Sequence, residues 1–532
     1  MRRLSRALGR NIVGRSSTVS PLPAQTLPVD MTRLQRLRAP LLMVLGSACY
    51  LLFTWSGAVG GELDAVSYLL MARYFAGDVS AAVAAEVQRS ILPPLYPLLL
   101  TLADGGRSLV GAHVLTTLSL LCALFLYHAW LRQQGLCRWQ RAALVALFAS
   151  LPITLGFSLE LLSESFYMAL SLAALISLGH APEARAGHWW IRAGLAIGLA
   201  MVCRSVGLAL VLSLLVLGLR SKSRACVSAF VLAAMPTLTW WVAKAAQGID
   251  GGYASAFVAR LFDGDQAPVS ALISNLQRQA EALLNTWLNL LGLFPEWPQQ
   301  LLAALLGLAS CLGMGLRLRK GQPDALYGLF YLGMVLAWPY PRHAERLLCP
   351  LLPLLLFYAW SVIARFTWLR RLVPGLLLVA LLPAWLFIAE RWWNGHQLAS
   401  PDYAQTRRWY SRAALADARE DARRRELFVQ AMVALKDTVP PEACVYFLRP
   451  RELALYADRR GLDFPLPAVP DAAFRLDQCD WAMLTSFTTH YAPQPLYPIE
   501  RMRGQFKVVS VVRDGVGEDA PIITVLGRFL QR

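Results

Sequence analysis

The sequence predicts a polytopic α-helical membrane protein of about eleven spans, followed by a small extramembrane α/β domain. The 532 residues are 56% hydrophobic and only 16% charged, whereas a soluble domain carries roughly a quarter charged residues. Apolar runs long enough to cross a bilayer recur between residues 40 and 391, with basic residues between them. A polar tail follows from residue 392 to residue 532. This pattern excludes an ordinary water-soluble enzyme.

The apolar runs define the expected spans. About 20 apolar residues at 1.5 Å each cross a hydrocarbon layer of about 30 Å. Eleven runs are expected to do so, near residues 40–60, 108–130, 142–158, 161–179, 190–203, 206–219, 226–246, 297–316, 324–340, 347–366 and 372–390. The fifth and sixth runs are short and share Arg204. They form either a hairpin with Arg204 at its outer tip or one long helix with a buried arginine.

The basic residues favour the hairpin and set the orientation, because cytoplasmic loops are enriched in Arg and Lys. Eight arginines precede the first run, so residues 1–39 are expected to be a basic cytoplasmic tail. Every second later loop is also basic, at 132–141, 185–192, 220–224, 317–320 and 365–371. A single helix over 190–219 would break this alternation at three later loops. The large loops 61–107 and 247–296 and the tail 392–532 are then external.

The net charge of +17 belongs largely to this membrane region, because residues 400–532 hold 19 basic and 17 acidic side chains. Nucleic acid is therefore not the expected partner. Residues 1–29 lack acid and are rich in Arg and Ser, which is also typical of organellar transit peptides. Met31 offers an equally good start, so a disordered tail or a misplaced initiation site is the favoured interpretation.

The first outer loop begins with GELDAVSYLLMARYFAGD, in which Asp64 and Tyr68 share a helix face. We expect an amphipathic helix at the membrane surface. Asp64 alone is better explained by helix capping than by catalysis, and the surrounding pattern shifts the balance toward catalysis. The run ILPPLYPLLL, with prolines 93, 94 and 97, predicts a rigid bend that returns the chain to the lipid.

These motifs resemble the GT-C superfamily of integral membrane glycosyltransferases, in particular the protein O-mannosyltransferase and lipid A aminoarabinose transferase branch. That family has D-x-x-x-Y-x-x-x-A and then P-P-x-x-P in the first outer loop. Later segments match in order. Each of these segments contains one residue that matches a charged residue of the family. Glu164 lies in SLELLSESFYMALSLA, Arg204 in GLAIGLAMVCRSVGLALV, and Arg346 in RHAERLLCPLLPLLL. The chain departs from the pattern in two places, since it has Glu62-Leu63-Asp64 rather than adjacent acids and Leu347 where an aromatic is expected.

The resemblance implies a polyprenyl-phosphate-dependent glycosyltransferase in the bacterial cytoplasmic (inner) membrane and the cell envelope. A sugar would pass, with inversion if displacement is direct, from the lipid carrier to a lipid, glycan or protein acceptor. Asp64, or Glu62 in its place, is the expected base. The expected carrier-binding and substrate-binding residues are Tyr68, Glu164, Arg204, Arg342, His343 and Arg346.

Each of these residues also has a structural interpretation. Arg204 interrupts some thirty apolar residues, which favours function, with Glu164 or Glu160 as its partner. Arg342 and Arg346 are equally well explained by snorkelling or by pairing with Glu345. His343, beside Arg342, is more simply structural.

No cofactor is required by these motifs, and no metal ligand set is predicted. Asp263-Gly264-Asp265 has oxygen ligands that suit Mg²⁺ or Mn²⁺, but an ordinary turn is favoured. The sequence has no Gly-rich phosphate loop, which argues against a nucleotide sugar as the direct donor.

The tail predicts a charged helix over 402–435 and strands at CVYFL, WAMLTSF, FKVVSVV and IITVL. We expect this α/β module to pack over the outer loops. Cys444 and Cys479 form a disulfide if the tail lies in an oxidising compartment, a pairing that sequence separation leaves open.

Two rival functions remain. A transporter or flippase for lipid-linked glycans would also use many spans and an intramembrane arginine, although the chain has no internal repeat. An O-antigen-type ligase or polymerase would instead depend on late-loop arginines and His343.

Overall fold

The computed structural model describes residues 45–54, 59, 63–181, 187–221, 224–246, 268–292, 296–395, 415–464, 478–486, 506–517 and 519–530. The chain divides into two compact units, Met1–Cys49 and Tyr50–Arg532. The described part of the first unit is the beginning of an apolar helix, Leu45–Thr54. All other described elements belong to the second unit. Met1, Met31 and the basic tail lie outside the described residues.

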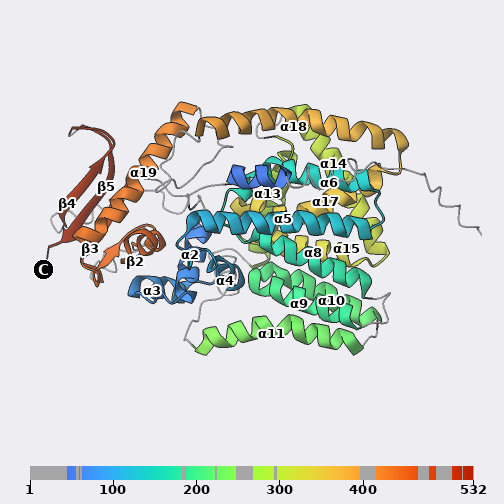
Figure 1. Ribbon diagram of the computed structural model, residues 1–532, viewed down its shortest axis with the longest axis horizontal. Coiled ribbons are helices and arrows are strands. Elements are labelled where there is room, and N and C mark those ends of the chain that lie inside the picture. The colour runs from blue at the N-terminus through green and yellow to red at the C-terminus, as the bar shows by residue number, and fades with distance from the viewer. Residues whose placement is uncertain are drawn as a thin grey trace, which may run out of the picture. The chain divides into compact units, whose positions relative to one another are not determined.

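Apolar helices occur where the sequence predicts spans (Figure 1). Among the described residues, five helices are long and apolar enough to cross a bilayer. They are α5 (Leu109–Gln133), α11 (Arg224–Ala246), α14 (Trp297–Arg319), the segment Ala344–Ile363 and the Thr367–Glu390 part of α18 (Thr367–Gly395). The pair α6 (Arg138–Ser150) and α7 (Pro152–Ser158), bent by 63°, is a candidate broken sixth span. The multi-span helical fold is confirmed, and the number eleven stays a prediction.

The remaining expected spans correspond to shorter apolar helices. They are the helix Leu45–Thr54, α8 (Glu164–His180), α9 (His188–Cys203), α10 (Leu208–Ser221) and α15 (Pro323–Ala337). Between α15 and α17 (Leu352–Ile363), the chain makes three short turns, η2 (Pro341–His343), α16 (Ala344–Leu348) and η3 (Cys349–Leu351).

The helical hairpin around Arg204 is confirmed. Helix α9 ends at Cys203, Arg204 adopts an extended backbone, and the short helix η1 (Ser205–Gly207) leads into α10. A Cβ on Gly187, at the start of α9, would lie 3.5 Å from the Cβ of Ala225 at the start of α11, and Gly218 near the end of α10 contacts Cys226. Since the start of α9 and the end of α10 both lie beside the start of α11, α9 and α10 run in opposite directions. One continuous helix is excluded.

The loop over residues 61–107, which is predicted to be external, contains α2 (Leu63–Phe75), α3 (Ala81–Arg89) and α4 (Leu95–Leu100). The predicted helix is present, but its description as an amphipathic surface helix is wrong. Residues 65–72 are all buried, because the sequence is apolar on every side and such a helix is covered on every side. Gly77, at a φ of +96°, ends this segment with a backbone conformation that glycine adopts without strain.

The C-terminal module consists of α19 (Leu415–Thr438) and a five-stranded sheet of order β2-β1-β3-β5-β4. The strands are β1 (Cys444–Tyr446), β2 (Arg460–Leu462), β3 (Trp481–Thr485), β4 (Phe506–Arg513) and β5 (Ile522–Phe529). Strands β2, β1 and β3 are parallel, whereas β5 is antiparallel to both β3 and β4. The four predicted strands are confirmed, and β2 is an additional one.

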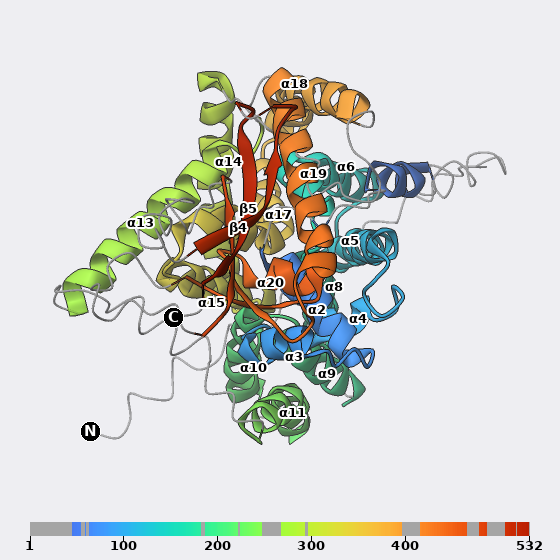
Figure 2. The same cartoon turned by 90° about the vertical axis from the view of Figure 1, so that its left-hand side faces the viewer.

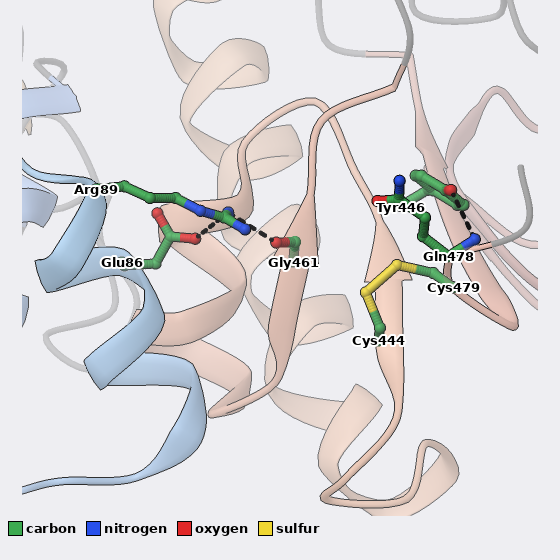
Figure 3. The surroundings of a disulfide bond; sticks show 7 residues. All are labelled: Glu86, Arg89, Cys444, Tyr446, Gly461, Gln478 and Cys479. Carbon is green, nitrogen blue, oxygen red and sulfur yellow. Dashed lines mark hydrogen bonds and ion pairs between the residues drawn. A yellow bond between two sulfur atoms is a disulfide. The ribbon is translucent and has the colours of Figure 1, made fainter. Parts of the chain in front are cut away.

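Alternation along the strands gives the sheet two packed faces. Val445 and Met483 pack with α19 residues in one apolar cluster, while Tyr446 and Leu484 belong to a second cluster. Cys444 and Cys479 form a disulfide beside the second cluster (Figure 3).

The C-terminal module contacts the loop over residues 61–107, as predicted. Arg73 Nη1 of α2 donates to the Leu455 carbonyl at 2.9 Å, within η4 (Leu453–Ala457). Arg89 Nη1 of α3 donates to the Gly461 carbonyl at 3.3 Å and pairs with Glu86, as Figure 3 shows.

The second predicted external loop, residues 247–296, is not simply polar. Its described part contains the 21-residue helix α13 (Pro268–Leu288), which lies beside α14 and α15 (Figure 2).

Candidate functional site

Four segments that are far apart in the sequence bring five predicted residues together. Asp64 and Tyr68 come from α2, Glu164 from the first turn of α8, Arg204 from the break after α9, and Arg346 from α16. We call Asp64, Glu164, Arg204 and Arg346 the acid–arginine cluster.

Arg346 is at the centre of this cluster. Its Nη1 donates to Asp64 Oδ2 at 2.5 Å, and its Nε donates to Glu164 Oε1. Arg204 Nη1 lies 2.6 Å from the same Glu164 oxygen. Glu164 therefore accepts from both arginines, as expected for the partner of Arg204, while Asp64 holds one of them.

Burial differs sharply within the cluster. The Glu164 side chain is 1% exposed, Arg346 10%, Arg204 13% and Asp64 29%. Buried charges are tolerated when they are paired, and here two carboxylates balance two guanidinium groups. Asp64 is consequently the member that an incoming molecule reaches most readily.

The environment of Asp64 has two opposing electrostatic effects. Burial alone would raise the pKa of its carboxyl group, but the charge and hydrogen bond of Arg346, together with the charges of Arg451 and Arg204, outweigh burial. The pKa of Asp64 is therefore held below its ordinary value, and the carboxylate stays ionised at neutral pH.

Two residues that the sequence did not indicate hold the cluster in place. Ser163 Oγ accepts from Arg204 Nη1 at 3.1 Å and lies 2.9 Å from the Tyr68 hydroxyl. The Tyr96 ring packs edge-on against Tyr68, with centroids 4.9 Å apart. Tyr96 belongs to the Pro-Pro-Leu-Tyr-Pro run, so the predicted bend delivers this ring into the core.

A third arginine reaches the site from the C-terminal module. Arg451, in α20 (Pro450–Glu452), donates from Nη1 to Ser67 Oγ at 2.9 Å, three residues after Asp64 on α2. Its charge also lowers the pKa of Asp64. No motif distinguishes Arg451 from the many other arginines of the tail, which is why sequence analysis missed it.

Several predicted site residues lie outside this cluster or outside the residues that the structure describes. The His343 ring lies 6.3 Å from that of Tyr340. The side chain of Arg342, together with Glu62, Asp263 and Asp265, lies outside the described residues, so the roles of these four stay predictions. In the described ranges, no three His, Cys, Asp or Glu residues are grouped to hold a metal ion.

Neither the family models nor the curated proteins match this sequence. Solved structures do match. ArnT from Cupriavidus metallidurans bound to undecaprenyl phosphate aligns with a TM-score of 0.55 and 13% identity, over 92% of this chain and 98% of that one. The apo form of the same protein gives a TM-score of 0.52 and 12% identity, with the same coverage.

The chain has the fold of ArnT. Because ArnT is a lipid A aminoarabinose transferase of the GT-C type, the resemblance indicated by the motifs is confirmed at the level of the fold. At 13% identity, this likeness assigns no residue a role.

Proposed function

We propose that this protein is a glycosyltransferase that moves a sugar from a polyprenyl-phosphate carrier to an acceptor hydroxyl at the outer face of the bacterial cytoplasmic membrane. The observation that carries the proposal is the acid–arginine cluster, in which a partly exposed carboxylate is bonded to one of two largely buried arginines. The shared fold supports it, since the matched ArnT structure contains undecaprenyl phosphate.

Arg204 and Arg346 are suited to the carrier phosphate. A guanidinium group presents planar, always charged donors that match phosphate oxygens. Both arginines are fixed by Glu164, so they need little reorganisation when charge develops on the departing phosphate. Arg346 is also bonded to Asp64, and a bound phosphate would therefore compete with Asp64 for this arginine.

Asp64 is suited to accept the proton of the attacking hydroxyl. Asp64 is ionised and is the most exposed member of the cluster. It is also hydrogen-bonded to Arg346, the arginine that would bind the leaving phosphate. Direct attack on the sugar carbon opposite the phosphate gives inversion. Tyr68 acts as a positioning residue, because its hydroxyl meets Ser163, which in turn fixes Arg204.

The disulfide supports an external location for the C-terminal module, because such bonds persist in oxidising compartments. That module contacts α2, which carries Asp64. An external module therefore implies an external active site.

The test is incorporation of labelled sugar from a polyprenyl-phosphate donor in proteoliposomes. Asp64→Asn should abolish transfer while insertion into the membrane is unchanged. Asp78→Asn is the matched control, since Asp78 lies in the same loop and pairs with the exposed Arg107. Glu62→Gln in the same assay decides between the two neighbouring acids. Full activity of Asp64→Asn would refute the assignment.

The same assay separates the rival functions. A ligase or polymerase that uses the late loop would lose activity in His343→Ala and keep it in Asp64→Asn. A flippase would move lipid-linked sugar across the bilayer without forming a new glycosidic bond.

A further inference from the structure

Helix α13 has three distinct faces, which follow from its 100° step per residue. Apolar side chains are exposed on one face, among them Leu272, Ile273 and Leu276. Polar residues such as Gln277 and Arg278 occupy the next face and are also exposed. The third face, which we call the amide face, consists of Ala271, Asn275, Gln279, Ala282 and Thr286. This arrangement is typical of a helix at the boundary of lipid and water.

The amide face packs against the protein although it carries polar groups. Asn275 is 2% exposed, and its Nδ2 donates to the carbonyls of Ala337 and Trp338 at 3.2 and 3.3 Å. Gln279, one turn further on, is 0% exposed. Neither its Oε1 nor its Nε2 has a hydrogen-bond partner among the described residues.

A buried amide without a partner is unfavourable, because it has lost its hydrogen bonds to water and gained none in return. A leucine would fill the same position without this penalty. The presence of glutamine at this position is explained if its amide hydrogen-bonds to a ligand that supplies both a donor and an acceptor.

The position of the amide face links it to the acid–arginine cluster. Helix α13 packs against η2 and α16, and α16 carries Arg346. Asn275 is bonded to the carbonyls at the end of α15, directly before η2. The amide face therefore lies on a helix that packs against the segment carrying Arg346.

We infer that the unpartnered amide of Gln279, on the buried face of α13 beside the Arg346-bearing α16, binds hydroxyl groups of the carrier-linked sugar. This inference rests on the proposed function. A sugar hydroxyl is both donor and acceptor and is neutral, and it thus complements a neutral amide, whereas a phosphate complements the arginines. Asn275 is a positioning residue, because its two bonds to backbone carbonyls fix α13 against the end of α15.

The test measures lipid binding by the full-length protein in nanodiscs, followed by tryptophan fluorescence. The probes are undecaprenyl phosphate and the same lipid bearing glucose, galactose, mannose or arabinose. The wild type should bind at least one sugar-bearing lipid more tightly than the bare phosphate. Gln279→Leu should reduce that preference about tenfold or more, which is the size expected for loss of a buried hydrogen bond, and should leave affinity for the bare phosphate unchanged.

Gln277→Leu is the matched control, because it makes the same change on the exposed face of the same helix. It should keep the wild-type preference. Thermal unfolding without lipid separates binding from folding. Gln279→Leu should be at least as stable as the wild type, because the unpaired amide is removed, and Gln279→Met provides a second variant of similar volume.

Three results would overturn the inference. They are a wild type with no preference for any sugar-bearing lipid, an unchanged preference in Gln279→Leu, and a lower stability of both Gln279 variants. If the wild type binds neither the bare phosphate nor any sugar-bearing lipid, the proposed function itself fails.

Discussion

Replacing Glu164 with glutamine tests whether the negative charge of Glu164 is needed to balance the two arginines of the site. Glu164 is 1% exposed and accepts from both Arg204 and Arg346. The change leaves two largely buried arginines with Asp64 as the remaining carboxylate of the cluster. Removing one partner of a buried ion pair costs about 3–5 kcal/mol, and glutamine retains a neutral acceptor. We therefore expect the free energy of unfolding to fall by about 3 kcal/mol.

The assay is thermal unfolding of the purified protein in detergent, with and without undecaprenyl phosphate. Under the proposed function, the phosphate replaces the missing negative charge, so it should stabilise Glu164→Gln more than the wild type. Asp324→Asn is the matched control, because Asp324 is 3% exposed and accepts from Arg317 at 2.6 and 2.7 Å. Asp324→Asn should lose stability that the lipid does not restore. Wild-type stability of Glu164→Gln, or equal rescue of both variants, would refute the reasoning.

Three further predictions test packing, crosslinking and electrostatics. Gly313→Ala should destabilise the protein by about 2 kcal/mol in thermal unfolding, because the new Cβ would clash with a backbone carbonyl of α17. Gly315→Ala, on the same helix, is the control and should be neutral, because its Cβ would have no atom within 4 Å. Cys444→Ser should cost about 3–4 kcal/mol, because it opens a disulfide between positions 35 residues apart, and limited proteolysis of the C-terminal module would detect the loss. Arg451→Gln should shift the acidic limb of the kcat/KM profile to higher pH. The charge of Arg451 lowers the pKa of Asp64, which must be ionised to act as a base; an unchanged or lower acidic limb would contradict this.

The helices were largely predictable, because span length and charge alternation are local properties of the sequence. The break at Arg204 followed from the positive-inside pattern and is present in the structure. The burial of α2 was not predicted correctly, since it depends on α3, α4 and the C-terminal module covering this helix. A hydrophobic pattern shows which face of a segment prefers burial, but what covers the other face depends on tertiary packing.

The site was predictable where each residue stood out in its own segment. A charge within an apolar run, such as Arg204, is unusual enough to notice. Ser163 and Arg451 do not stand out in this way, because serines near helix starts and arginines in polar tails are common. Their contacts with Arg204 and Ser67 join positions 41 and 384 residues apart, which no local pattern encodes.

The geometry of Arg346 links the two halves of the proposed reaction. In the structure, this arginine bonds Asp64 and holds the pKa of its carboxyl low, which makes Asp64 a weak base. A carrier phosphate that binds Arg346 would draw its hydrogen bonds away from Asp64. The effect of burial on the carboxyl would then count for more, so its pKa would rise and it would become a stronger base. Asp64 would accordingly become a stronger base only when the donor is bound. If the acceptor binds alone, the Asp64 carboxylate stays hydrogen-bonded to Arg346 and remains a weak base.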